Sequence, residues 1–513
     1  MRKILLLFSF LMMIGFNGVA QAPTWNTCVG NIIYSKCSSC HHAGTIAPFS
    51  LMSYADAVAN ASAISSDVSA HIMPPWSPDP NYCHYLHERL LTAAEINDIV
   101  NWVSAGTPLG SAATPPVAPV FSGVSLIPSP DLVLQMPTYI STASSSDVFR
   151  CFVIPTGVTT DKYIEQIEVI PGNNSIVHHV IVYTDNGTIC TALDAADTLP
   201  GYASTGGTGD HYSKRIGVWT PGQGKIELPL GFGFKLPANA NIVLQIHYES
   251  GSAGQSDSTK IKIKYSSLAS PRQIHLDAPL DNFNSTLIDG PLFIEPDSIK
   301  TFHELDTVPV PISVFTIQPH MHYVGKSINC YGITPLGDTI KMMKIDEWEF
   351  HWQGQYDFPH PVYIPAGTVL YSEATYDNTP ANEENPAGGV TEVIAGEASN
   401  NEMMMTFFNY TGYLPGDENL NIDSMLTLGV PNTEVASPIN KVNIYPNPSR
   451  EKIYFNSENK DTPIEAELFN LLGETVINKQ KGNEMNLSDL SPGVYFIHIK
   501  QGDLLETEKI IKE

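Results

Sequence analysis

Short runs of β-branched residues, each bounded by proline, glycine or asparagine, fill residues 130–430 of this chain. Val, Ile and Thr favour strands, and the bounding residues favour turns. The clearest runs are YIEQIEVI (163–170), SIVHHVIVY (175–183), ANIVLQIHYE (240–249), TKIKIKYSS (259–267), ISVFTIQPHMHYVG (312–325), PVYIPAGTVLYSEATYD (361–377) and EMMMTFFNYTGY (402–413). This pattern predicts a mainly β protein with two all-β sandwiches, residues 130–270 and 271–432.

The two ends of the chain differ from this β-rich middle in their sequence patterns. Helical periodicity appears in residues 54–72 and 92–104, and Thr92 with Glu95 forms a capping-box pattern before the second run. Residues 23–110 are therefore expected to form a small α-helical domain, and residues 111–129 a linker. Residues 440–513 contain short strands with glycine turns, which predict a small immunoglobulin-like β-sandwich.

The N-terminus predicts export. Arg2 and Lys3 precede an apolar run that ends at Phe16, and small residues follow up to Ala22, so residues 1–22 are typical of a signal peptide. No later stretch reaches about 20 apolar residues, so no integral membrane segment is expected in the mature chain. The net charge is −26 and no basic block is present, which excludes nucleic acid as a partner.

A heme-attachment motif lies in the helical region. Cys37, Cys40 and His41 form the C-x-x-C-H pattern, in which two thiols bond to heme c and the histidine is an axial ligand to iron. A zinc site would need a second ligand pair, and a redox dithiol would not need His41. Met73 in HIMPPW (71–76) is the expected second axial ligand, because a Met/His pair suits electron transfer. The stretch resembles a cytochrome c module.

The chain has seven cysteines, and export permits disulfides. We expect Cys28 to pair with Cys83 and Cys151 with Cys190. Cys330 then remains unpaired, either buried or free.

Histidines recur in apolar strand runs and predict two metal sites. Imidazole suits copper, and a thioether favours its cuprous state. His320 and His322 alternate along one strand and should converge on one ion. Neighbours on a strand face opposite sides, so His178 and His179 reach one ion only through a distortion or through different ring nitrogens, with His247 as the third ligand. A methionine in an apolar strand is usually a core residue, so metal ligation is one of two interpretations here. Spacing does not choose between Met403 and Met405 as the ligand.

Residues 130–430 resemble the copper type II, ascorbate-dependent monooxygenases, the family of peptidylglycine α-hydroxylating monooxygenase and dopamine β-monooxygenase. The matching pieces, in order, are FRCFVIP (149–155), PGNNSIVHHV (171–180), LQIHYE (244–249), PHMH (319–322), ATYDN (374–378) and NEMMM (401–405). The resemblance implies two jelly-roll-like domains with two copper ions facing each other across a solvent cleft. It assigns an electron-storing copper to His178, His179 and His247, and a dioxygen-binding copper to His320, His322 and Met403.

The implied reaction hydroxylates a C–H bond of a small organic substrate with O2, using electrons from ascorbate or another external one-electron donor. Peptide-amidating members carry an arginine where this chain has Gln318, and a tyrosine where it has Phe407. These departures favour a neutral substrate over a peptide carboxylate. One chain with both centres also suggests that the heme relays electrons to copper. The alternative is a non-catalytic heme and copper electron carrier or copper-binding surface protein.

The C-terminal region resembles the sorting domain of type IX secretion substrates. The likeness lies in YPNP (445–448), LFNLLGE (468–474) and GVYFIHI (493–499). It implies recognition by the type IX machinery, passage across an outer membrane, and surface attachment or release.

Overall fold

The computed structural model describes residues 22–43, 47–111, 115–121, 125–221, 223–284, 286–429, 442–457, 462–470, 475–501 and 504–512. The predicted signal peptide therefore lies almost wholly outside the described residues, as does part of LFNLLGE. The chain divides into two compact units, one of Met1–Trp76 with Arg89–Ser122 and one of Ser77–Glu88 with Gly123–Glu513. Among the described residues, no helix is both long and apolar enough to cross a membrane.

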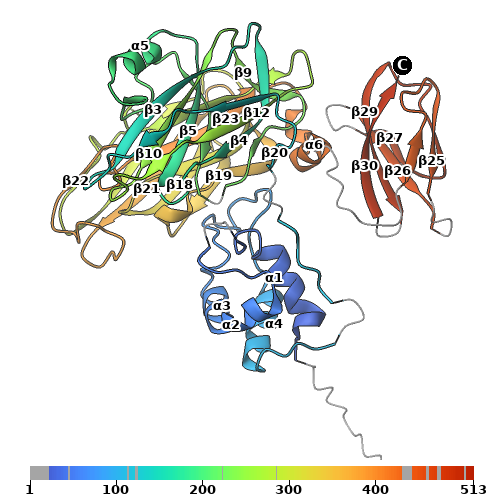
Figure 1. Ribbon diagram of the computed structural model, residues 1–513, viewed down its shortest axis with the longest axis horizontal. Coiled ribbons are helices and arrows are strands. Elements are labelled where there is room, and N and C mark those ends of the chain that lie inside the picture. Colours follow the sequence, from blue (N-terminus) through green and yellow to red (C-terminus); the bar gives the residue numbers. More distant parts are fainter. Residues whose placement is uncertain are drawn as a thin grey trace, which may run out of the picture. The chain divides into compact units, whose positions relative to one another are not determined.

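The smaller unit is helical, as predicted (Figure 1). Its elements are the π-turn η1 (Trp25–Val29), α1 (Gly30–Lys36), α2 (Tyr54–Ala59), α3 (Ala61–Ser69) and α4 (Ala93–Ser104). The predicted capping box is confirmed, because the Thr92 hydroxyl accepts from the Glu95 N–H and the Glu95 carboxylate accepts from the Thr92 N–H. The periodic run 54–72 is split into two helices at Asn60, whose amide donates to the Asp56 carbonyl.

The segment Ser77–Glu88 packs with the larger unit, a connection that the sequence pattern did not indicate. The Asp79 N–H donates to the Lys344 carbonyl at 2.8 Å, and the Tyr85 hydroxyl donates to the Met342 carbonyl at 2.6 Å. These bonds tie the segment to a strand of the second β region.

Two antiparallel-rich sheets make up residues 130–273 (Figure 1). The first has the order β1 (Leu132–Gln135), β12 (Lys260–Tyr265), β4 (Lys162–Ile170), β9 (Phe232–Leu236) and β13 (Arg272–Gln273), with β8 (Ile226–Glu227) on β4. The second has the order β6 (Tyr202–Ala203), β3 (Val148–Pro155), β10 (Asn241–Tyr248), β5 (Val177–Asp185) and β7 (Lys214–Trp219). Helix α5 (Ile189–Ala196) follows β5, and β2 (Tyr139–Ile140) pairs with β11 (Ser256–Asp257).

Residues 275–429 form two further four-stranded sheets. One has the order β14 (His275–Asp281), β23 (Met405–Gly412), β17 (Ile312–His320) and β20 (Tyr356–Ile364). The other has the order β16 (Ser298–Thr307), β21 (Val369–Asn378), β18 (Gly325–Ile333) and β19 (Thr339–Ile345). The remaining elements are β15 (Phe293–Ile294) with β22 (Val393–Ile394), the 3-10 turns η2 (Phe350–Trp352) and η3 (Asp417–Asn419), and α6 (Ile422–Gly429).

One apolar core joins the two β regions. Phe232 of the first and Phe315 of the second lie with ring centroids 4.7 Å apart, within a single cluster of buried side chains. The Arg272 guanidinium forms a two-pronged ion pair with Asp417, at 2.6 and 2.8 Å. Bidentate arginine–carboxylate pairs of this kind are stronger than hydrogen bonds between neutral groups. The two β regions are therefore packed into one body.

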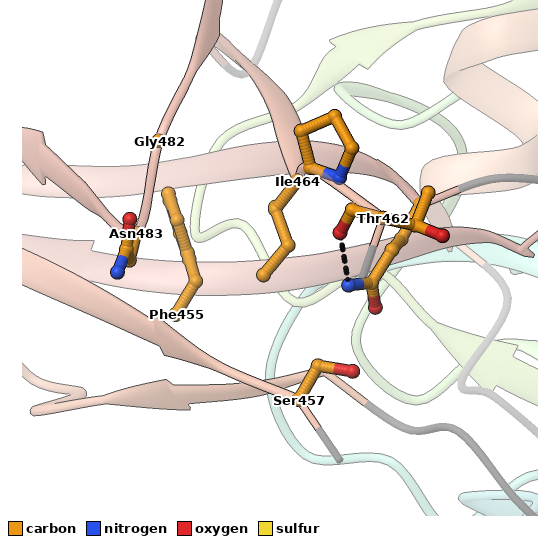
Figure 2. A pocket seen from close by; sticks show the side chains of 8 residues that line it. Phe455, Ser457, Thr462, Ile464, Gly482 and Asn483 are labelled. Carbon is orange, nitrogen blue, oxygen red and sulfur yellow. Dashed lines mark hydrogen bonds between the residues drawn. The ribbon is translucent and has the colours of Figure 1, made fainter. Parts of the chain in front are cut away.

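The C-terminal region forms two small sheets with its own core. Their orders are β24 (Asn443–Tyr445), β25 (Lys452–Asn456), β28 (Glu484–Asn486), and β27 (Thr475–Lys481), β26 (Glu465–Phe469), β29 (Gly493–Gln501), β30 (Leu504–Lys512). A pocket of about 170 Å³ opens between Phe455, Ile464 and Asn483, where the Gln501 amide donates to the Thr462 carbonyl (Figure 2). No residue that lines this pocket is a metal-binding or nucleophilic candidate.

Candidate metal centres

A β-bulge brings the first three histidines together. His247 on β10 lies directly opposite His179 on β5, but the next pair is Tyr248 with Val177, so the register skips His178. A bulge places two residues of one strand against one residue of its neighbour and redirects their side chains. It supplies the distortion that two adjacent histidines need to reach one point.

The three rings converge. Ring centroids lie 4.8 Å apart for His178 and His247, 4.9 Å for His179 and His247, and 5.4 Å for His178 and His179. One ring nitrogen from each histidine can be chosen so that all lie within 4.8 Å of one another, and the two Nδ1 atoms of the neighbours are 3.2 Å apart. This is a geometry that one ion can satisfy.

Burial favours the neutral form of two of the three histidines, His178 and His179. It lowers the pKa of His178 to about 3, with the charge of His247 as the next cause, and it lowers the pKa of His179 well below the usual value. Neutral imidazole is the form that binds a metal. His247 is also buried, and neither of its ring nitrogens has an aligned hydrogen bond.

A carboxylate stands behind the cluster. Asp147 Oδ2 lies 3.1 Å from His247 Nε2. Burial opposes ionisation of Asp147, but the contact with His247, the Ser250 N–H and the Ser399 hydroxyl together hold its pKa below the usual range. A carboxylate that orients one ring nitrogen leaves the other free to bind a metal, which is a common arrangement around metal ligands.

The second pair, His320 and His322, lies at the end of β17. The strand ends at His320, so the predicted alternation of both residues along one strand is wrong. The chain turns after Met321, and the rings still meet, with centroids 5.1 Å apart and planes at 87°. A turn of the chain, rather than the pleat of a strand, therefore brings the rings together.

Both imidazoles of this pair use Nδ1 to contact an oxygen of the surrounding protein. His320 Nδ1 bonds the side-chain oxygen of Gln353, and His322 Nδ1 lies 3.2 Å from the Asn401 carbonyl. An Nδ1–H held by an oxygen leaves Nε2 as the metal-binding atom. Burial lowers the pKa of His320 to about 4, although Gln353 opposes the shift, and it lowers the pKa of His322 well below the usual value.

Both candidate methionines lie beside this pair. Met405 is the β-ladder partner of His320, and Met403 precedes β23. Both are 6% exposed and belong to the same core cluster, from which Met404 is absent. Met403 and Met405 therefore share a side of the segment, and the choice between them stays a prediction from the family resemblance.

Glu402 links the backbone of His322 to that of Met403 through hydrogen bonds. Its fully buried carboxylate accepts from the N–H groups of His322 at 2.8 Å, Val324 at 2.9 Å and Met403 at 3.1 Å. Burial raises the pKa of Glu402 to about 8 against the pull of these donors. Its supporting role could not be read from the sequence, because its partners lie about 80 residues away.

An aromatic side chain lies between the two clusters. The Phe350 ring stacks on His178 at 5.6 Å and 15°, and meets His322 edge-on at 6.0 Å. Tyr323 covers the same ring at 4.1 Å. One imidazole of each cluster therefore contacts Phe350, where the resemblance implied solvent alone.

An arginine also stands near the second pair. The Arg215 guanidinium lies 4.5 Å from the centroid of Phe407, and its charge contributes to the lowered pKa of His320. Gln318 occupies the position at which the peptide-amidating enzymes carry an arginine. The positive charge near His320 therefore comes from a residue of β7. The spacing of residues along β17 could not predict that β7 lies nearby.

In the helical unit the heme motif follows α1. Burial, and then the charge of Cys40, raises the pKa of the Cys37 thiol to about 12. The backbone turns tightly here, because the Cys40 and His41 N–H groups both donate to the Cys37 carbonyl. His41 Nδ1 lies 3.1 Å from the Phe49 carbonyl, so that Nε2 is left for an axial bond. Met73 is half-buried after α3, and its role as an iron ligand stays a prediction.

The expected disulfides are not present, because all seven cysteines are thiols. Cys28 and Cys83 belong to different compact units. Cys151 and Cys190 share one buried cluster without a bond between them, and their sulfurs contact the carbonyls of Gly207 and Thr208. Cys330 is buried, as one of its two predicted states required.

Two parts of the chain match known families. Residues 300–423 match the family model "Copper type II ascorbate-dependent monooxygenase, C-terminal domain", a range that contains His320, His322 and Met403. Residues 443–513 match the family model "Secretion system C-terminal sorting domain". The three-histidine cluster lies outside both matched ranges.

Curated relatives agree with the first match. DBH-like monooxygenase protein 2 of Mus musculus is 25% identical over 284 residues, which cover 51% of this chain and 43% of the mouse protein. Its Homo sapiens counterpart is 22% identical over 291 residues, which cover 51% of this chain and 53% of the human protein. The chain thus spans about half the length of the curated relatives it matches.

Solved structures show only weak likeness. A peptide-N(4)-(N-acetyl-β-D-glucosaminyl) asparagine amidase is 13% identical with a TM-score of 0.23, covering 55% of this chain and 97% of that one. A Ruminococcus gnavus β-glucuronidase has a TM-score of 0.11 at 11% identity, covering 42% and 36% of the two chains. TM-scores this low establish no common fold. From the family matches, the chain carries a copper type II ascorbate-dependent monooxygenase C-terminal domain, and its sorting domain marks it as a secreted or cell-surface protein.

Proposed function

We propose that this protein is a secreted copper monooxygenase that hydroxylates a C–H bond of a small organic substrate with O2. The observation that carries the proposal is the presence of two converging histidine clusters in one compact unit, one of them inside the matched monooxygenase domain. Copper bound at these clusters would supply one-electron chemistry and a place for O2 to react.

The donor sets differ in a way that suits two roles. His178, His179 and His247 offer three nitrogens, a set suited to a copper ion that stores an electron. His320 and His322 offer two, and Met403 is proposed as a soft third ligand that favours the cuprous state. Met405 is the other candidate for that position.

The residues around the clusters hold the ligands ready. Asp147 orients His247, Gln353 orients His320, and Glu402 fixes the backbone of His322. Ligands fixed by such partners need little reorganisation when an ion enters or changes charge. The Phe350 ring contacts one imidazole of each cluster.

The substrate class follows from the surroundings of His320. Phe407 and Gln318 provide an apolar and a neutral polar surface, while Arg215 brings a positive charge to the far side of the Phe407 ring. We propose a small organic molecule whose reacting carbon approaches His320. Arg215 makes a negatively charged group on the substrate acceptable, in contrast to the neutral substrate expected from Gln318 and Phe407.

The helical unit is proposed to carry heme c on Cys37 and Cys40, with His41 and Met73 as axial ligands. The hydrogen bond from His41 to the Phe49 carbonyl supports this assignment. The heme would relay electrons to the three-histidine copper, replacing or supplementing ascorbate. Rapid mixing with a reductant tests the relay, because copper in His41→Ala or Met73→Ala should then be reduced more slowly than in wild type.

Oxygen uptake with ascorbate tests the main proposal. The wild-type protein should consume O2 only after copper loading, lose the activity on chelation, and yield a product one oxygen atom heavier than the substrate. His320→Ala should abolish uptake, whereas His303→Ala, an exposed histidine paired with Asp289, should not. Reversible redox bleaching without coupled O2 consumption would instead identify an electron carrier.

A further inference from the structure

A third cluster of metal-binding side chains lies at the end of β5 that is distant from the histidines. Asp185 ends the strand, Cys190 follows in α5, and Asp210 lies in the loop before β7. One carboxylate oxygen of each aspartate and the Cys190 sulfur all lie within 4.8 Å of one another. The exposed fractions of the three residues are 1%, 0% and 5%.

The two carboxylates are incompletely bonded. Asp185 Oδ1 accepts from the Ser213 hydroxyl at 3.1 Å and from the Gly187 N–H at 3.3 Å, and Asp210 Oδ1 accepts from the Tyr212 N–H at 2.9 Å. The Oδ2 atom of each is buried and has no hydrogen-bond partner. In the described part of the chain, neither forms an ion pair with lysine, arginine or histidine.

Two buried carboxylates side by side need a proton or a cation to offset their negative charge. Buried charges in proteins are normally paired or bound to a metal, because leaving water costs several kcal/mol per ion. A shared proton would join the two carboxyl groups without involving the adjacent sulfur, which contacts the Thr208 carbonyl at 3.9 Å and the Ser213 hydroxyl at 3.6 Å. A cation would instead engage both orphaned oxygens and the sulfur.

We propose that Asp185, Asp210 and Cys190 bind one zinc ion. Calcium and magnesium take oxygen ligands, whereas zinc accepts a mixed set of thiolate and carboxylate in tetrahedral geometry. The fourth position falls to the Ser213 hydroxyl, which lies 3.6 Å from the Cys190 sulfur, or to water. The Cys190 thiol gives up its proton to solvent when the zinc–sulfur bond forms.

Gly187 forms a wall of this site. A Cβ at this position would lie 2.4 Å from Asp210 Oδ2, the oxygen without a partner. Its backbone is not among the positive-φ glycines, so an alanine would be excluded by the space and not by backbone strain. Gly187→Ala therefore perturbs the site without removing a ligand.

The site would tie three segments of the first β region together. It joins the end of β5, helix α5 and the loop that leads into β7, all outside the proposed copper chemistry. The zinc site is therefore independent of whether the protein is a monooxygenase.

Cobalt(II) serves as the spectroscopic probe for zinc in the full-length chain. A cobalt–thiolate bond gives a near-ultraviolet charge-transfer band, which the histidine clusters cannot produce. In a Cys37→Ser, Cys40→Ser background, which removes the other thiol pair, we expect this band in the parent protein and in Cys330→Ser, a buried-thiol control, and its loss in Cys190→Ser. Asp185→Asn, Asp210→Asn and Gly187→Ala should each weaken zinc binding at least ten-fold, with circular dichroism confirming that they fold.

The wild-type protein offers a test that no folding defect can obscure. Zinc should slow alkylation of Cys190 relative to Cys330, as mapped by mass spectrometry. A Cys151–Cys190 disulfide in the intact mass, a charge-transfer band that survives Cys190→Ser, or alkylation of Cys190 indifferent to zinc would each overturn the proposal.

Discussion

Asp147 should govern copper affinity at the three-histidine cluster, and Asp147→Asn isolates its charge. The amide keeps the shape of the side chain and an oxygen for the Ser250 N–H, which bonds Oδ1 at 3.0 Å. The change falls on Oδ2, which faces His247 at 3.1 Å and accepts from Ser399. Asparagine thus removes one negative charge and one acceptor behind a proposed ligand.

The size of the effect follows from distance and burial. An ion bound on the far side of an imidazole lies roughly 6 Å from this carboxylate, where two unit charges interact by about 2.8 kcal/mol at an effective dielectric constant of ~20. The Asp147 side chain is 16% exposed, and solvent reduces this figure. Loss of such a partner lowers metal affinity by about 10–100-fold, or about 1.4–2.8 kcal/mol.

Copper(I) affinity should be measured by chelator competition in a His320→Ala, His322→Ala background, so that only the three-histidine cluster binds. Asp161→Asn is the matched control, because it removes a carboxylate of the same β region that pairs with Lys235. Since Asp147 stays ionised below the usual range, the difference should be constant between about pH 5 and 8. An affinity within three-fold of wild type would refute the reasoning.

Three further predictions rest on other contacts. Phe350→Ala should leave copper loading intact but slow electron exchange between the two centres more than Phe350→Leu does, as followed by freeze-quench electron paramagnetic resonance; equal rates would dismiss a role for the ring. Glu304 is fully buried with its pKa raised to about 8 by burial, so its contribution to stability is complete below its ordinary value of 4.5 and is lost as pH rises through 8. The urea midpoint of wild type should therefore drop from pH 5 to pH 9 more than that of Glu304→Gln, and parallel curves would contradict this. Thr92→Ala should destabilise the helical unit by about 1 kcal/mol through loss of the α4 cap, with Ser66→Ala, at an exposed position of α3, as the control in thermal unfolding.

Local sequence patterns were enough to predict many of the helices and strands. Thr92 and Glu95 predicted the start of α4, because a capping box involves residues only three apart. Alternating β-branched residues located β4, β5, β10 and β12 to within a few positions. The disulfide between Cys151 and Cys190 was wrong, since proximity in a cluster does not decide whether two sulfurs face each other.

The partners of the candidate ligands were beyond local reasoning. Asp147 lies 100 residues before His247, and Glu402 lies 80 residues after His322. Asp147 stands in no pattern that marks it, and the NEMMM run marks Glu402 only as the acidic residue before Met403, because the hydrogen bonds of both carboxylates join distant segments. Phe350 likewise occupies a 3-10 turn whose position no periodicity indicates.

The residue types indicate the chemistry available to this protein, since several imidazoles grouped in apolar runs suit copper, whereas a methionine in such a run is equally a core residue. Their convergence was decided by tertiary structure. The bulge at His178 and the turn after His320 depend on which strands pair and in what register, and register is set by contacts between residues far apart in the chain. A local pattern therefore names the candidate ligands, and only the packed sheets determine which of them meet.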